Sequence, residues 1–168
     1  MTLKEVNGLD REGFVAAFGG IFEHSPWVAE QAWALRPFAT VAGLHEIMVR
    51  AVERASKERQ LELIRAHPDL GARVKMSAAS AGEQAGAGLD RLTAEEFERL
   101  QALNSAYREK FGFPFIYAVK GSTKYDVLRA LEQRLQVDIE LERSTALAQI
   151  GRIAQFRLAD VIQDQETR

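Results

Sequence analysis

Apolar residues recur at intervals of three and four along most of this chain, whereas the period-two alternation of a half-buried strand is scarce. The clearest example is Leu44, Ile47, Met48, Ala51 and Val52, which fall on one face of a helix. Such faces are stable only when they are buried against other elements. The sequence therefore predicts an all-α fold, a single compact bundle of about eight helices.

Capping residues and helix breakers place the helix ends. Asp10 precedes one apolar stripe, Pro26 suits the first turn of the next, and Thr93 opens a capping-box pattern. The helix that begins at Pro26 is expected to carry Leu35 on its apolar face and to stop before Pro37. The expected helices cover residues 10–18, 26–36, 44–52, 57–65, 93–111, 124–137 and 138–163, with a short one beginning near 81.

The stretch from Phe111 to Val119 does not follow the helical pattern. It is apolar and interrupted by Gly112 and Pro114, so a short strand or a buried irregular connection would fit. In an all-α chain the irregular connection is favoured. Buried irregular backbone leaves amide and carbonyl groups that need partners, and a small polar ligand can supply them.

Composition sets the class of protein. The 168 residues fit one domain, 1–168, and 46% hydrophobic with 27% charged residues is typical of a globular chain. A net charge of −2 argues against nucleic acid as a partner.

No apolar run approaches the roughly 20 residues of a membrane helix, and the N-terminus has no apolar signal segment, so a cytoplasmic location without membrane contact is expected. The absence of cysteine excludes disulfides, thiol nucleophiles and cysteine-bound zinc.

His67, in His67-Pro68-Asp69, is the first candidate for chemistry. The ordinary pKa of imidazole lies near neutral pH, which suits a group that both takes up and delivers protons. The alternative is a histidine at a helix end, where the helix dipole stabilises its charged form. His24 and His45 have no charged companions in a distinctive pattern, and three scattered histidines do not indicate a metal site.

The segment Ser80-Ala81-Gly82-Glu83-Gln84 gathers a hydroxyl, a carboxylate and a carboxamide. Ser-x-x-Glu is also a capping box, which would simply begin a short helix near Ala81. The two interpretations are compatible, because a capped helix N-terminus presents free N–H groups that favour anions. Glu83 and Gln84 would lie about 100° apart on a helix, so both could border one pocket.

Arg157 lies on an apolar helical stripe with Ile150, Ala154 and Val161. An arginine there is costly unless it is paired or its stem carries the charge outward to water. The functional alternative is a planar fork that binds a carboxylate or an imide-like group. The sequence contains no dinucleotide loop and no phosphate loop.

Several stretches carry a family resemblance through their order and spacing. They are residues 65–71, residues 80–84 with 87–89, residues 97–107, residues 111–116 and residues 150–158. Asn7 with Phe14 and Phe18, and residues 25–27, extend the match toward the N-terminus. Together they resemble the OHCU decarboxylase family, which converts 2-oxo-4-hydroxy-4-carboxy-5-ureidoimidazoline (OHCU) to (S)-allantoin in the last step of urate breakdown. The resemblance covers essentially the whole chain.

This resemblance implies an all-helical decarboxylase that needs no cofactor or metal, acts on the small molecule OHCU and is commonly a homodimer. The family's catalytic residues map onto His67 and Glu83, with His67 as the acid that protonates the intermediate. Its substrate-binding residues map onto Pro68, Ser80, Ala81, Gly82, Gln84, Phe115, Ile116, Tyr117, Ala118, Val119 and Arg157.

Two other functions stay open on the residues alone. A hydrolase of a related hydantoin or ureido ring could use the same His/Glu pair to activate water. A non-catalytic helical binding module could use residues 113–119 as a partner groove, with His67 and Glu83 merely structural. Product analysis separates the first from a decarboxylase, because ring hydrolysis releases no carbon dioxide.

Overall fold

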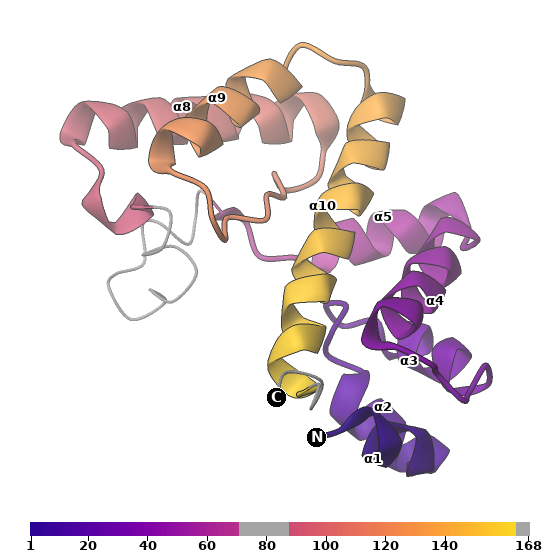
Figure 1. Ribbon diagram of the computed structural model, residues 1–168. Coiled ribbons are helices and arrows are strands. Elements are labelled where there is room, and N and C mark those ends of the chain that lie inside the picture. Colours follow the sequence, from indigo (N-terminus) through magenta and orange to yellow (C-terminus); the bar gives the residue numbers. More distant parts are fainter. Residues whose placement is uncertain (71–87, 164–168) are drawn as a thin grey trace. The chain divides into compact units, whose positions relative to one another are not determined.

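The computed structural model describes residues 1–70 and 88–163, and this part of the chain is all-α, as predicted (Figure 1). It contains eight α-helices and one 3₁₀ helix, and no strand is found in the described ranges. The chain packs as two units. Residues 67–149 form the second unit and the rest of the chain forms the first. The expectation of a single domain stays a prediction.

The first unit is built from the N-terminal helices and the C-terminal part of the last helix. Helix α2 packs on α3, and α3 packs on α4. The N-terminal residue lies against the end of α10, where the Gln163 amide donates to the Met1 carbonyl over 2.9 Å. The helices are α1 (Leu3–Gly8), α2 (Arg11–Phe18), α3 (Pro26–Trp33), α4 (Val41–Glu53), α5 (Lys57–Ala66) and, from residue 150 onward, α10 (Ile139–Val161).

Side-chain hydrogen bonds cap the N-termini of α1 and α2. The Thr2 hydroxyl accepts from the Glu5 amide while the Glu5 carboxylate accepts from the Thr2 amide, a complete capping box. Asp10 caps α2 as predicted, by accepting from the Gly13 amide over 2.8 Å. Helix α1 was missing from the prediction, although its Thr-x-x-Glu pattern is legible in the sequence.

The predicted end of α3 was wrong. The helix ends at Trp33, and Leu35, expected on its apolar face, is 60% exposed. Two successive amides, those of Leu35 and Arg36, bond to carbonyls three residues back, which tightens the last turn and rotates Leu35 off the buried stripe.

The second unit begins with η2 (Leu89–Arg91), followed by α8 (Ala94–Phe111), α9 (Lys124–Arg134) and the first part of α10. Thr93 forms the predicted capping box with Glu96, and Thr123 forms another with Asp126. Helices α8 and α9 lie side by side (Figure 1). Helix α9 is capped at Leu135, so it is shorter than the predicted 124–137.

The connection after α8 is buried and irregular, as predicted. Gly112 ends α8 in the left-handed conformation with φ of 73°, and its amide donates to the Arg108 carbonyl. Neither helix nor strand is formed between residues 112 and 119. Pro114 is buried in this connection. So are Phe113, Phe115, Ile116, Ala118 and Val119, each of which is at most 5% exposed.

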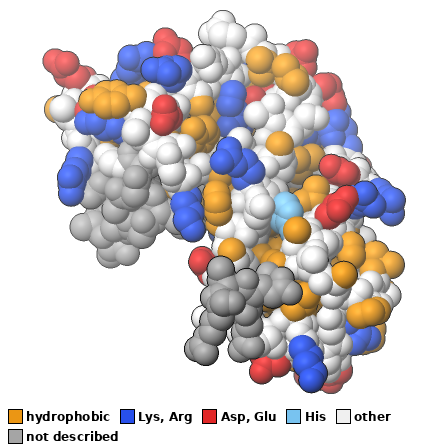
Figure 2. Space-filling view, in the orientation of Figure 1, with side chains coloured by type: hydrophobic (Ala, Val, Ile, Leu, Met, Phe, Trp, Pro, Cys, Tyr) orange, Lys and Arg blue, Asp and Glu red, His pale blue; other side chains and the backbone are white. Residues whose placement is uncertain are grey.

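On the face drawn in Figure 2, Lys and Arg side chains are interspersed with Asp and Glu, in keeping with the net charge of −2. Within the described residues, no helix combines the length and the apolar character that crossing a bilayer requires.

Candidate functional site

The predicted site residues are distributed over both units. Pro68, His67 and residues 115–119 belong to the second unit, and Arg157 belongs to the first. The contacts of each can therefore be followed within its own unit. The predicted residues that lie outside the described part of the chain are Ser80, Ala81, Gly82, Glu83 and Gln84.

His67 is a buried side chain just beyond a helix end. Helix α5 ends at Ala66, and His67 is only 6% exposed, whereas the adjacent Pro68 is exposed. An ion pair connects the turn to α8, with Arg108 Nη1 at 2.8 Å from Asp69 Oδ2. A histidine that served only to interact with the helix dipole would have no need of burial.

The other two histidines have different surroundings. His45 Nε2 lies 2.7 Å from the Gly151 carbonyl oxygen, so this nitrogen carries the proton and donates it. His24 is exposed and has a φ of 46° in the turn before α3. In the described ranges, no three His, Cys, Asp or Glu side chains are grouped so that they could hold a metal ion.

Residues 115–119 are tied down by side chains of the same unit. Arg134 Nη1 donates to the Ile116 carbonyl over 2.6 Å, and the Ala118 amide donates to Gln149 Oε1 over 2.9 Å. The Arg134 guanidinium also lies 4.5 Å from the centre of the Phe115 ring. Protein side chains, and not a ligand, thus satisfy two of the backbone groups of this segment.

Behind this segment lies a buried polar network that was not predicted. Glu142 Oε1 accepts from the Tyr107 hydroxyl over 2.5 Å and from Arg134 Nε over 2.6 Å. Tyr107 and Glu142 are fully buried. Burial, and donation to Glu142, raise the pKa of the Tyr107 hydroxyl far above its ordinary value of 10.0.

One sequence signal could have pointed to this network. Glu142 shares a helical stripe with Ala146 and Ile150, which are buried and spaced four residues apart. A carboxylate on an apolar stripe needs a buried donor or cation. The stripe indicates that Glu142 needs a buried partner, but it does not identify that partner.

Arg157 has a partner of its own in the first unit. Its Nη2 lies 2.6 Å from Glu23 Oε1, and its Nη1 donates to the Ile21 carbonyl over 3.2 Å. Of the alternatives weighed for an arginine on an apolar stripe, pairing is the one present in the structure. Glu23 and the Ile21 carbonyl together hold the guanidinium group of Arg157 in position.

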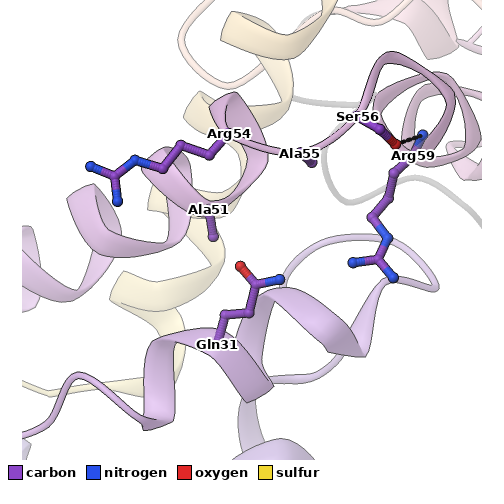
Figure 3. Close-up of a pocket in the computed structure, with 6 residues that line it drawn as sticks. All are labelled: Gln31, Ala51, Arg54, Ala55, Ser56 and Arg59. Carbon is purple, nitrogen blue, oxygen red and sulfur yellow. Dashed lines mark hydrogen bonds between the residues drawn. The ribbon is translucent and has the colours of Figure 1, made fainter.

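A surface hollow of about 410 Å³ lies in the first unit (Figure 3). The Gln31 carboxamide points toward it, whereas the Arg54 side chain points away, and Arg59 stacks 4.7 Å from the centre of the Trp27 ring. None of the lining residues belongs to the predicted site. They are Gln31, Ala51, Arg54, Ala55, Ser56 and Arg59.

Fold and site together describe an all-α protein with a buried histidine beyond a helix end and a tethered apolar loop. A family model described as OHCU decarboxylase matches residues 7–159, a range that includes every predicted site residue. The chain belongs to the OHCU decarboxylase family.

Individual relatives agree with this assignment. The chain is 51% identical over 160 residues to 2-oxo-4-hydroxy-4-carboxy-5-ureidoimidazoline decarboxylase of Haloferax volcanii, covering 95% of each chain. It is 46% identical to the uric acid degradation bifunctional protein of Bacillus subtilis, covering 98% of this chain and 33% of that one. Among solved structures, (S)-allantoin synthase matches with a TM-score of 0.80 and 37% identity, covering 96% of this chain and 54% of that chain.

Proposed function

We propose that this protein is a carboxy-lyase that converts OHCU to (S)-allantoin in urate degradation. The observation that carries the proposal is the family match over residues 7–159, and the 51% identity to the Haloferax volcanii decarboxylase supports it. The substrate contains an imine beside the carbon that bears the carboxylate, so it provides its own electron sink.

The reaction consists of two steps. First, the carbon–carbon bond to the carboxylate breaks, its electron pair moves into the adjacent imine and carbon dioxide leaves. Second, the carbon of the former imine in the enamine-like intermediate takes up a proton on one face, which determines the enantiomer formed, while the substrate hydroxyl gives up its proton and becomes a ring carbonyl. His67 is the proposed donor of this proton. Its burial supports the role, because an enclosed site keeps out the water that would protonate either face.

The remaining proposed residues bind and orient the substrate. Glu83 accepts hydrogen bonds from the substrate hydroxyl or a ring N–H, and Arg157 offsets negative charge on the carboxylate or ring. The carbonyl and urea-like groups are bound by the backbone of residues 115–119 and by the segment 80–84, with Pro68 lining the site. Arg157 enters this proposal already paired with Glu23.

We expect the protein to act in the cytoplasm as a homodimer. Multi-angle light scattering of the purified protein measures the oligomeric state directly. A monomer with full activity would remove the dimer from the proposal while leaving the chemistry intact.

The decisive experiment generates the unstable substrate in place from urate with urate oxidase and hydroxyisourate hydrolase, and follows allantoin by circular dichroism. The wild-type protein is expected to produce one enantiomer rapidly, and His67→Asn is expected to fold but to lose most turnover. Slow racemic allantoin with the wild-type protein would refute the decarboxylase. Near-normal turnover by His67→Asn would remove His67 as the proton donor.

A further inference from the structure

The Tyr107–Glu142–Arg134 network joins three helices of the second unit through one carboxylate. Tyr107 lies on α8, Arg134 on α9 and Glu142 on α10. Glu142 is 0% exposed, and 11% of the Arg134 side chain is exposed. Arg134 Nη2 also lies 2.5 Å from Glu142 Oε1, so the guanidinium and the carboxylate form an ion pair as well as a hydrogen bond.

Such a network is a poor device for packing alone. Taking both charges out of water costs much of what their attraction returns, and apolar side chains of similar volume often stabilise a core as well or better. The network is therefore best understood from what else it contacts. The Arg134 guanidinium has a second partner, the Ile116 carbonyl, and lies over the Phe115 ring.

Those contacts fall on residues 115–119, which have no helix or ladder to set their conformation. Arg134 fixes this segment at Ile116, and Gln149 fixes it two residues later at Ala118. The rings of Phe115 and Tyr117, the two residues that flank Ile116, stack with their centres 6.0 Å apart. Arg134 and Gln149 thus hold two backbone groups of the segment, and the Val119 carbonyl accepts a further hydrogen bond from the Ser122 amide.

We infer that Arg134, oriented by Glu142 and Tyr107, and Gln149 are positioning residues for the substrate-contacting backbone of residues 115–119. The inference rests on the proposed function, since it assigns the segment a role in holding the substrate. Arg134 and Glu142 act through the backbone and not on the reacting atoms. Loss of the tethers leaves His67 in place but lets the segment take several conformations, so substrate binding and facial selectivity weaken together.

The test compares variants that remove one tether with a control that removes an ion pair elsewhere in the unit. Arg134→Lys keeps a positive charge beside Glu142, but a single ammonium lacks the fork that reaches Glu142 and the Ile116 carbonyl together. Gln149→Met removes the acceptor for the Ala118 amide, and Gln149→Glu restores one. The control is Lys124→Gln, which breaks the Lys124–Glu96 pair between the same helices α8 and α9, at 2.7 Å.

Each variant is assayed for KM, kcat and the enantiomeric excess of allantoin, at a temperature where circular dichroism shows it folded. The expected result is a KM raised about tenfold in Arg134→Lys and Gln149→Met, with a lower enantiomeric excess. Gln149→Glu is expected within about twofold of wild type, as is Lys124→Gln despite its lower Tm.

Wild-type KM and selectivity in both Gln149→Met and Arg134→Lys would overturn the inference while leaving the decarboxylase intact. If Arg134→Lys does not fold, the Gln149 pair decides alone: Gln149→Met indistinguishable from Gln149→Glu overturns the inference. An inactive wild-type protein is a separate result, because it overturns the proposed function and, with it, this role of the segment.

Discussion

Arg157 Nη2 lies 2.6 Å from Glu23 Oε1, and the two side chains are 26% and 21% exposed. The arginine that the sequence singled out as costly on its apolar stripe is thus paired, at a depth between surface and core. A pair at this depth is partly screened by water, so it stabilises the fold modestly.

The first prediction concerns this pair. Glu23→Gln is expected to lower the free energy of unfolding by about 1 kcal/mol at low salt, and by less at about 1 M salt, because screening already weakens the wild-type pair. Urea denaturation at both salt concentrations measures the effect. Glu30→Gln is the matched control, since its pair with Arg11 is longer, at 3.4 Å, and more exposed. An equal loss in Glu30→Gln would show that the position of Glu23 is not special.

The second prediction concerns Tyr107 at alkaline pH. Its pKa is raised above the ordinary 10.0, chiefly by burial, so the folded protein keeps a proton that the unfolded chain releases. Stability therefore falls as the pH rises past about 10, by up to about 1.4 kcal/mol per pH unit from this group.

Tyr107→Phe is expected to lose about 1–3 kcal/mol at neutral pH, because Glu142 loses a buried hydrogen bond, and to show a shallower alkaline decline. Urea denaturation at about pH 8 and about pH 11 measures both effects. Tyr125→Phe, at a residue that is 61% exposed, should retain the wild-type decline. Parallel declines in Tyr107→Phe and the wild type would contradict the argument.

The third prediction concerns the acid limb. The hydrogen bond from Lys124, followed by the backbone amide of Thr93, lowers the pKa of Glu96 below its ordinary 4.5. The unfolded chain then binds this proton more readily than the folded one. The stabilising contribution is therefore complete above the ordinary pKa and is lost as the pH falls through the lowered value.

Accordingly, Glu96→Gln should have a lower Tm than wild type at pH 7, and the difference should shrink below about pH 4. Calorimetry at both pH values provides the measurement, with the neighbouring Glu95→Gln as control. A Tm difference for Glu96→Gln that does not change with pH would count against the linkage.

The fourth prediction concerns the end of α8. Gly112 has a φ of 73°, and a Cβ added there would meet nothing within 4 Å, so the cost of Gly112→Ala is conformational only. We expect a loss of about 1 kcal/mol in the free energy of unfolding by denaturant titration. Gly8→Ala, equally free of clashes but at the last helical residue of α1, should be neutral or stabilising. An unchanged stability for Gly112→Ala would contradict the left-handed cap.

Helices were predictable from sequence where a stripe and a cap agreed, as at Asp10 and Thr93. Leu35 was placed on the wrong face because the apolar spacing continues beyond the end of α3. At that end the backbone amides bond to carbonyls three residues back instead of four. Helix α1 was missed because it is short and only Val6 is buried, so it has almost no stripe to detect.

The contacts of the candidate site residues could not be predicted from the sequence. The stripe of Arg157 predicted either a partner or a stem that carries the charge out to water, and it could not identify Glu23, which is 134 residues away in the sequence. The irregular connection at residues 111–119 was correctly expected, yet Arg134 and Gln149 were not identified as its anchors. Pairings of this kind arise from tertiary packing, which leaves no local periodicity to read.

The way in which residues 115–119 are held has a consequence for where mutations matter. Arg134 and Gln149 bind a carbonyl and an amide, groups that every non-proline residue carries. The side chains at 116 and 118 are therefore constrained by size and apolar character alone. The polar side chains that hold this loop lie 18 residues after Ile116 and 31 residues after Ala118, in helices that are not part of the loop.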